Sequence, residues 1–169
     1  MMYSDKWKTW TAKLDFKTCF TCRGNHGKIY KINENVHPKP PIHPHCRCVI
    51  EKLKAIFAGA ATNQGLNGAD WYLKEYGILP EYYITKDYAE KIGYKSYLGN
   101  LFLVAPGKML FKGKYKNLNG HLPEKSGRVW YEADINYEWG YRGTERIVFS
   151  NDGLIFVTYD HFYTFYEIK

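Results

Sequence analysis

The chain has 169 residues, of which 45% are hydrophobic, and it carries a formal net charge of +7 at pH 7. Its 16 Tyr, 9 Phe and 5 Trp supply large side chains for a folded core. The sequence offers no run of about 18 apolar residues, which excludes a membrane-spanning helix, and its charged, aromatic start lacks the apolar stretch of a secretory signal peptide.

The positive charge is confined to the front of the chain. Residues 1–65 contain 11 Lys and Arg against 4 Asp and Glu, so their charge is 11 − 4 = +7, whereas residues 66–169 contain 13 of each kind. A general attraction for phosphate therefore applies to the front segment alone, and a solvated tail explains that charge equally well. Any binding of phosphate by the rest of the chain has to depend on a few well-placed cations.

The cysteines also lie only in the front segment. A C-x-x-C pair, Cys19 and Cys22, is followed by Cys46 and Cys48. This arrangement is typical of a structural zinc site, held by all four cysteines or by three of them and a histidine. The C-x-C spacing is less usual for zinc, so disulfides and free thiols stay as alternatives. We expect a small Cys/His-rich module over residues 1–50.

The segment after this module is predicted to connect it to a second domain. The proline-rich run 37–45 favours an extended backbone because proline fixes φ and lacks an N–H donor. Residues 49–58 are compatible with a short helix, and the Gly-, Ala- and Asn-rich stretch that follows is typical of a linker. We therefore predict a helix and linker over residues 51–65, and a second domain over 66–169.

Two short helices are expected at the start of the second domain. Asn67 as an N-cap, apolar residues at i, i+3, i+4 and i+7 spacing, and Gly77 as a stop predict a helix over residues 69–76. A second helix is predicted to start at Thr85 and to end at Gly93.

Beyond Gly107 the pattern changes to strands. In residues 129–137, apolar and aromatic side chains at the odd positions alternate with mostly polar side chains at the even positions, as in a half-buried strand. The apolar runs 146–150 and 154–159 are joined by Asn-Asp-Gly, a strong hairpin signal. Helices followed by an antiparallel meander predict an α+β fold.

A few residues in this half could carry chemistry. Glu132 and Asp134 share one face of a predicted strand. Two carboxylates so placed usually indicate a solvent-exposed face of a sheet, and the alternative is a concave face with a positioned general base. Arg142 and Arg146 follow directly, and hairpin pairing could bring them over the carboxylates as a phosphate clamp. His161 follows a predicted strand, where a lone histidine is usually structural or exposed. A carboxylate and an imidazole nevertheless form a suitable acid–base pair near neutral pH.

Six stretches of this half resemble barnase and the related small microbial ribonucleases. They are LPEYYITK (79–86), GNL (99–101), VAPGK (104–108), LPEKSGRVWYEADINY (122–137), YRGTERI (141–147) and DHFYTF (160–165). They occur in the family's order and without a gap over residues 69–169. The resemblance implies helices packed on a twisted antiparallel sheet, and an endoribonuclease that needs no metal for catalysis.

The same resemblance implies roles for individual residues. Glu132 would be the general base and His161 the general acid in a transesterification through a 2′,3′-cyclic phosphate. The scissile phosphate would be bound by three cations, Lys86, Arg142 and Arg146. Asp134 would hold the arginines in place.

The sequence departs from the family at the base-recognition loop. The expected substrate-binding residues there are Tyr115, Lys116, Asn117 and Asn119, with Phe162 beside the histidine. The family has an arginine and a glutamate where this chain has Leu118 and Asn119. An amide cannot offer two acceptors to the two donors of guanine, so we predict a weaker or altered base preference, by about 1–3 kcal/mol for one missing hydrogen bond.

Residues 15–50 resemble the Cys/His motif of minor head or head-morphogenesis proteins of tailed phages, which implies a structural or delivery role.

We expect an endoribonuclease toxin that is secreted or delivered by a non-classical route and acts on cytoplasmic, single-stranded RNA. Its expected partners are RNA and a barstar-like immunity protein. The alternatives are a phage structural protein with an inactive ribonuclease-like domain, against which the complete set of site residues argues, and a basic zinc module that binds nucleic acid itself.

Overall fold

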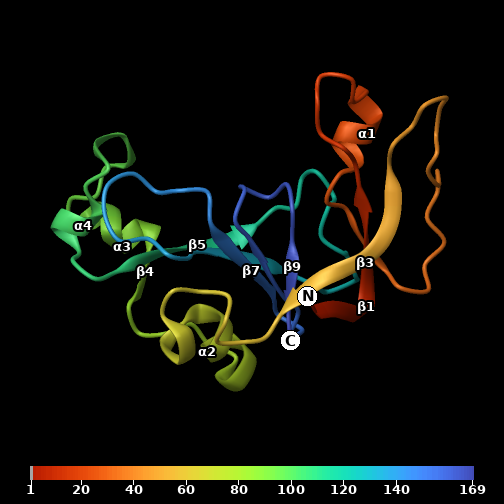
Figure 1. Ribbon diagram of the computed structural model, residues 1–169. Helices are drawn as coiled ribbons and strands as arrows, with labels where there is room; N and C mark the ends of the chain where they lie inside the picture. The colour runs from red at the N-terminus through yellow and green to blue at the C-terminus, as the bar shows by residue number, and fades with distance from the viewer. Residues whose placement is uncertain (1) are drawn as a thin grey trace.

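A computed structural model describes residues 2–169 as one nine-stranded sheet with short helices around it (Figure 1). The strands lie side by side in the order β2-β1-β3-β9-β8-β7-β6-β5-β4. The elements of the front segment are β1 (Met2–Thr11), α1 (Phe20–Asn25), β2 (Ile29–Lys31) and β3 (Val49–Ile56). The following elements are η1 (Gly65–Asn67), α2 (Ala69–Tyr76), β4 (Tyr83–Thr85), α3 (Lys86–Lys91), η2 (Ser96–Leu98), α4 (Leu101–Val104), β5 (Met109–Tyr115), β6 (Trp130–Asp134), β7 (Arg146–Ser150), β8 (Ile155–Thr158) and β9 (Tyr166–Ile168).

The sheet is mostly antiparallel, with two parallel pairings. Strands β5 to β9 form an antiparallel meander, and β4 joins its outer edge parallel to β5. On the other side, β3 pairs parallel with β9, where Ala55 and Ile56 face Glu167 and Ile168. The front segment and the meander are therefore joined by backbone hydrogen bonds, as the neighbouring β3 and β9 show in Figure 1.

The predicted helix and linker over residues 51–65 is wrong in its first part. Residues 49–56 form strand β3, whose Leu53 and Ala55 are buried while Lys52 and Lys54 are exposed. This alternation has the period of a half-buried strand. The short run has no strong preference of its own, and pairing with β1 on one side and β9 on the other decides its conformation.

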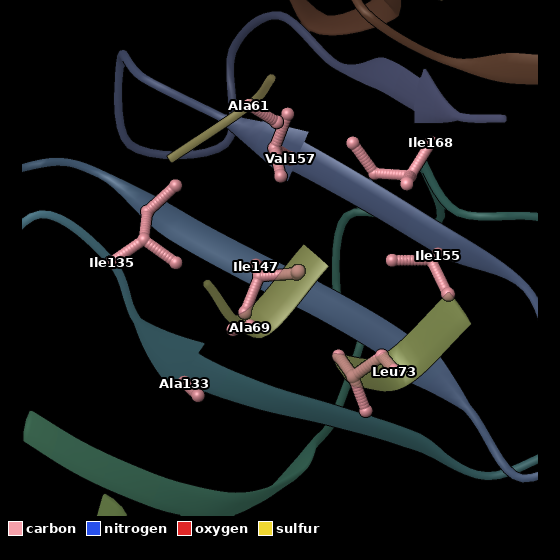
Figure 2. Close-up of a cluster of buried hydrophobic side chains, with 9 residues drawn as sticks. All are labelled: Ala61, Ala69, Leu73, Ala133, Ile135, Ile147, Ile155, Val157 and Ile168. Carbon is pink, nitrogen blue, oxygen red and sulfur yellow. The ribbon is translucent and has the colours of Figure 1, made fainter. Parts of the chain in front are cut away.

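The helix predicted over residues 69–76 is confirmed as α2, and it covers one face of the meander. Ala69 and Leu73 pack against Ala133, Ile147 and Ile155 from three neighbouring strands (Figure 2). The N-cap is Gly68 rather than Asn67, which lies in the preceding turn η1. Gly77 ends the helix with a φ of 71°, the left-handed conformation that glycine adopts without strain.

The opposite face of the sheet has a second core that both halves of the chain share. Trp7 and Leu53 of the front strands pack in one cluster with Trp130, Phe156 and Phe165 of the meander. Front segment and meander thus bury apolar surface against each other. The structure shows one continuous sheet and a shared core where the sequence predicted two units joined by a linker.

The other predicted elements of the second domain are present, with one strand shorter than expected. The second helix is confirmed as α3, with Thr85 as its N-cap, and the hairpin between β7 and β8 closes with a bond of 2.9 Å from Ser150 N to Leu154 O. Strand β6 is shorter than the predicted 129–137, because Asn136 takes a left-handed φ of 59°. Among residues 2–169, no helix has the length and apolarity needed to cross a membrane.

Candidate active site

The centre of the site is Asp134, a carboxylate that is only 1% exposed at the end of β6. Arg142 binds it with two parallel bonds, Nε to Oδ2 and Nη2 to Oδ1, each 2.6 Å long. Arg146 lies directly opposite on β7, and its Nε is 3.1 Å from Oδ1. The hairpin pairing predicted from the sequence therefore brings both arginines to one carboxylate.

Burial and charge act on the two guanidinium groups in opposite directions. Burial opposes the charge of Arg142, but the hydrogen bonds and charge of Asp134 outweigh burial and raise its pKa above the ordinary value. At Arg146 burial is the larger effect and lowers the pKa. Both groups stay charged near neutral pH, because arginine is not deprotonated in proteins. Two cations around one carboxylate leave a positive charge for a phosphate.

Glu132 lies on the same face of β6 as Asp134, at the edge of a groove. The groove is lined by Glu132, by three lysines of β5 and its end, and by the loop after it: Lys112, Lys114, Tyr115, Lys116, Asn117, Leu118 and Asn119. The charge of Glu132 acts to raise the pKa of Arg142 and of Arg146. The expectation of a wholly solvated face is wrong, because the flanking Trp130 and Asp134 are buried.

His161 sits in a tightly held loop between β8 and β9. Asp160 accepts bonds from the backbone N–H groups of Tyr163 and Thr164, and the buried Thr158 hydroxyl accepts one from Phe162 N. His161 itself is exposed and has a left-handed φ of 59°. Such strain in a non-glycine residue persists where the surrounding structure fixes it. The sequence reasoning missed Thr158 and Asp160, although Thr-x-Asp after a strand is a turn signal.

An aromatic stack joins the groove to the loop that carries His161. The rings of Tyr115 and Phe162 are stacked at 4.9 Å between centroids, and the edge of His161 meets Phe162 at 5.0 Å. Burial raises the pKa of the Tyr115 hydroxyl, and the charge of Glu132 raises it further. The structure thus places Tyr115, which lines the groove together with Glu132, against Phe162 and His161.

Lys86, the third predicted cation, lies on the surface at the start of α3. It is the first residue of α3, and its Nζ is 3.6 Å from Glu90 Oε1. Its side chain is 45% exposed. The structure therefore shows Lys86 in a surface ion pair with Glu90, which a flexible lysine can exchange for a phosphate at little cost.

The side chain of Asn117 holds the loop after β5 in shape. Asn117 is 6% exposed with a φ of 50°. Its amide donates to Leu122 O at 2.9 Å and to Glu124 Oε1 at 2.6 Å, and its oxygen accepts from Leu122 N. The Asn117 side chain therefore shapes the loop, and the binding of a base by this residue stays a prediction.

Asn119 is bound to a residue that the sequence reasoning missed. Its Nδ2 lies 3.2 Å from His121 Nδ1, and its Oδ1 accepts from His121 N at 3.1 Å. The other ring nitrogen of His121 is 2.9 Å from the carbonyl oxygen of Gly24 in α1. Asn119 stands where the family has its glutamate, so the base side of the groove is in contact with the front segment.

The four cysteines are free thiols and gather with His43 in the front segment. The Nε2 atom of His43 is 3.3 Å from the sulfur atoms of both Cys19 and Cys22, and Cys22 Sγ is 3.8 Å from Cys46 Sγ. Cys22, Cys46 and Cys48 form a second group within 4.8 Å. Five soft donors at these separations fit a tetrahedral metal ion. His43 and His45 both precede Cys46 in His-Pro-His-Cys, and the structure places His43 with the cysteines.

The thiols of this cluster differ in their ease of ionisation. Backbone hydrogen bonds from Cys48 and Ile42 lower the pKa of the Cys46 thiol to about 7. Burial raises the pKa of the Cys22 thiol. A bound metal ion would deprotonate both thiols, because the thiolate is the ligand.

Comparison with known proteins identifies the families that the two parts of the chain resemble. Residues 72–169, which are 98 of the 169 residues, match the model of the ribonuclease family. The chain belongs to the ribonuclease family. Residues 2–51 match the model of Phage Mu protein F like protein, in agreement with the phage resemblance of the front segment.

Curated relatives carry the same description. Ribonucleases of Heyndrickxia coagulans, Bacillus intermedius and Bacillus pumilus are each 47% identical to this chain over 103 residues, or 61% of its length. The chain spans 94% of the first relative but 64%, just under two thirds, of the other two.

Proposed function

We propose that this ribonuclease cleaves single-stranded RNA by transesterification, with Glu132 as the general base and His161 as the general acid. Glu132 takes the proton of the 2′-hydroxyl, and the 2′-oxygen forms a bond to phosphorus. The bond from phosphorus to the 5′-oxygen breaks, and His161 gives that oxygen its proton. Water then opens the 2′,3′-cyclic phosphate in a slower step with the two roles exchanged.

The observation that carries this proposal is the pair of arginines fixed on buried Asp134 beside Glu132. Arg142 uses Nε and Nη2 on Asp134, and Arg146 uses Nε there and Nη1 on a backbone carbonyl. Each guanidinium has five N–H groups, so both keep donors for phosphate oxygens. Donors held in place before the reaction stabilise the charge that grows on the pentacoordinate phosphate. This mechanism uses no metal ion.

The test compares cleavage of RNA by the native chain with that by Glu132→Gln and His161→Ala. Loss of an acid or base is expected to lower kcat about 10²- to 10⁴-fold. Glu75→Gln removes an exposed carboxylate from α2, on the covered face of the sheet, and serves as the control with unchanged activity. Activity that survives both site variants would refute the mechanism. An inactive native chain would favour a phage structural protein with an inactive domain.

We further propose that the front cluster holds a structural zinc ion with four of its five donors, Cys19, Cys22, His43, Cys46 and Cys48. The separations between these donors support a tetrahedral site. Metal analysis of the purified native chain should find about one zinc per chain. Metal-free protein with four titratable thiols, or with disulfides, would contradict the zinc site.

As a biological role we propose a toxin, delivered to target cells by a non-classical route and acting on their cytoplasmic RNA. The likeness of residues 2–51 to a phage protein supports it. A barstar-like inhibitor would cover the groove with acidic side chains, although exposed Leu118 offers it no cation. Expression inside a cell should stop growth for the native chain and not for Glu132→Gln. Equal toxicity of both would separate toxicity from RNA cleavage.

A further inference from the structure

We propose that the front segment helps to hold the base-recognition loop, residues 115–119. His121 is the positioning residue through which the Cys/His cluster fixes Asn119 in this loop. The inference rests on the proposed ribonuclease function and names how its base-recognition loop is held. In Figure 1 the teal loop after β5 lies between the centre of the sheet and the front strands.

The side chain of His121 connects the loop to the front segment. It is 7% exposed, and Nε2 lies 2.9 Å from the carbonyl oxygen of Gly24. A carbonyl only accepts, so Nε2 carries the proton, and Nδ1 is left as the acceptor for the Asn119 amide. With Asn119 Oδ1 accepting from His121 N, both polar atoms of the Asn119 side chain have fixed directions.

Backbone contacts close the same interface. Ile29 N donates to His121 O at 2.8 Å, which adds a strand-like bond between the front segment and the loop. Gly27, at a φ of 84°, presses so closely on Tyr163 that a Cβ atom there would lie 2.0 Å from the Tyr163 carbonyl oxygen. His26 Nε2 lies 3.4 Å from the hydroxyl of Thr164, in the loop that holds His161.

The Cys/His cluster determines where Gly24 lies. Helix α1 has only six residues, too few for a stable helix without outside support. Its N-cap is Cys19, whose sulfur accepts from Cys22 N at 3.4 Å, and Cys22 is itself within the helix. Two donors of the cluster therefore sit in the first turn of α1, and Gly24 follows within the same helix. A metal ion on these donors would fix α1 and with it the partner of His121.

The site therefore has two parts that are held in different ways. Strand pairing places Glu132 and Arg146, and Asp134 binds both arginines. The loop around Asn119 relies on Asn117 within itself and on His121 against Gly24. Disturbing the front contact should therefore change nucleotide binding and base preference while leaving the chemical step intact.

The experiment measures kcat and KM of the native chain, His121→Ala and His121→Gln on four dinucleotides that differ in the 5′ base. His121→Ala is expected to raise KM about three- to tenfold, the effect of removing one or two hydrogen bonds, and to leave kcat within about twofold. The amide of His121→Gln can still donate to Gly24 and should recover part of the loss. Lys54→Ala changes an exposed side chain of β3 and serves as the control.

A second arm removes the metal. Zinc-loaded and chelated protein are compared by hydrogen exchange of the backbone amides over residues 117–122 and by binding of the four nucleoside 3′-monophosphates, neither of which requires cleavage. Chelation, or Cys22→Ser, should speed exchange and weaken binding in the native chain, and chelation should add little to His121→Ala.

The outcomes separate this inference from the proposed function. A native chain that does not cleave RNA refutes the proposed function, whereas a cleaving chain with unchanged KM in His121→Ala refutes the coupling. Unchanged amide exchange after metal removal also overturns it. Additive effects of chelation and His121→Ala would show that the cluster acts on the loop by another route.

Discussion

Glu132 and Arg146 lie on neighbouring strands whose register places them, and Arg142, between these strands, is bound to Asp134. The loop that carries Asn119 is instead held by side-chain hydrogen bonds and by the front segment. On the first side, the partners Asp134 and Arg146 face each other across β6 and β7. On the second side, His121 meets a carbonyl that is 97 positions away in the chain. A family can keep its chemistry on such a sheet while its base recognition changes with the segments that surround the loop.

The largest effect is expected from removing the charge that organises the first side. Asp134→Asn leaves two cations around a neutral amide and should lower the free energy of unfolding by about 3 kcal/mol. Because the arginines lose their anchor, kcat should fall about a hundredfold. Urea unfolding and RNA cleavage measure the two effects.

The control for this variant is Asp152→Asn, which breaks the ion pair with Arg128 in the β7–β8 turn, outside the groove. Asp152→Asn should lower the free energy of unfolding by about 1 kcal/mol and leave kcat unchanged. If both variants lost activity equally, the special role of Asp134 would be contradicted.

The next effect concerns the second side. Asn119→Glu supplies a carboxylate that can accept both donors of a guanine edge, so preference for guanosine should rise about tenfold. The ratio of kcat/KM between guanosine- and adenosine-containing dinucleotides measures it. Asn119→Gln lengthens the side chain without adding charge and should leave the ratio near that of the native chain. A native chain already strongly selective for guanosine would refute the predicted loss of preference.

A smaller effect is expected from the lysines along the groove. Lys112 and Lys114 line it beside Glu132, so replacing both by alanine should raise KM for long RNA several-fold. Each lysine–phosphate ion pair that is removed should make the slope of log affinity against log salt less negative by about 0.7. Lys74→Ala on α2 removes a charge from the covered face and should leave the slope unchanged. Equal slopes for all variants would mean that RNA does not follow β5.

The smallest effect is a pH dependence at the interface of the two halves. Burial lowers the pKa of His26, which Asp160 raises in part and His121 lowers further. The unfolded chain therefore binds more protons than the folded one as the pH falls through the ordinary value of about 6.5, and stability falls with it. His26→Asn should show a shallower drop in the urea midpoint between pH 7.5 and 5.5. An unchanged slope would show that His26 does not contribute.

Local patterns in the sequence predicted the parts of the fold that depend on neighbours in the chain. The helix over 69–76, the hairpin around Asn151 and the strand of Glu132 follow from periodicity and turn chemistry. The burial of Asp134 did not follow, because a carboxylate in an alternating strand is usually exposed. It becomes buried only where two arginines compensate its charge.

The sequence by itself determined the ribonuclease half of the chain, through its likeness to the family, and the group of cysteines, through their spacing. The roles of the site residues stay predictions. Tertiary structure alone decided that residues 49–56 are a strand, that His43 joins the cysteines, and that His121 binds Gly24. These contacts join residues far apart in the chain, and their energies come from pairing and burial that no local pattern contains. For that reason the ribonuclease half could be identified from the sequence, and the way its base-recognition loop is held could not.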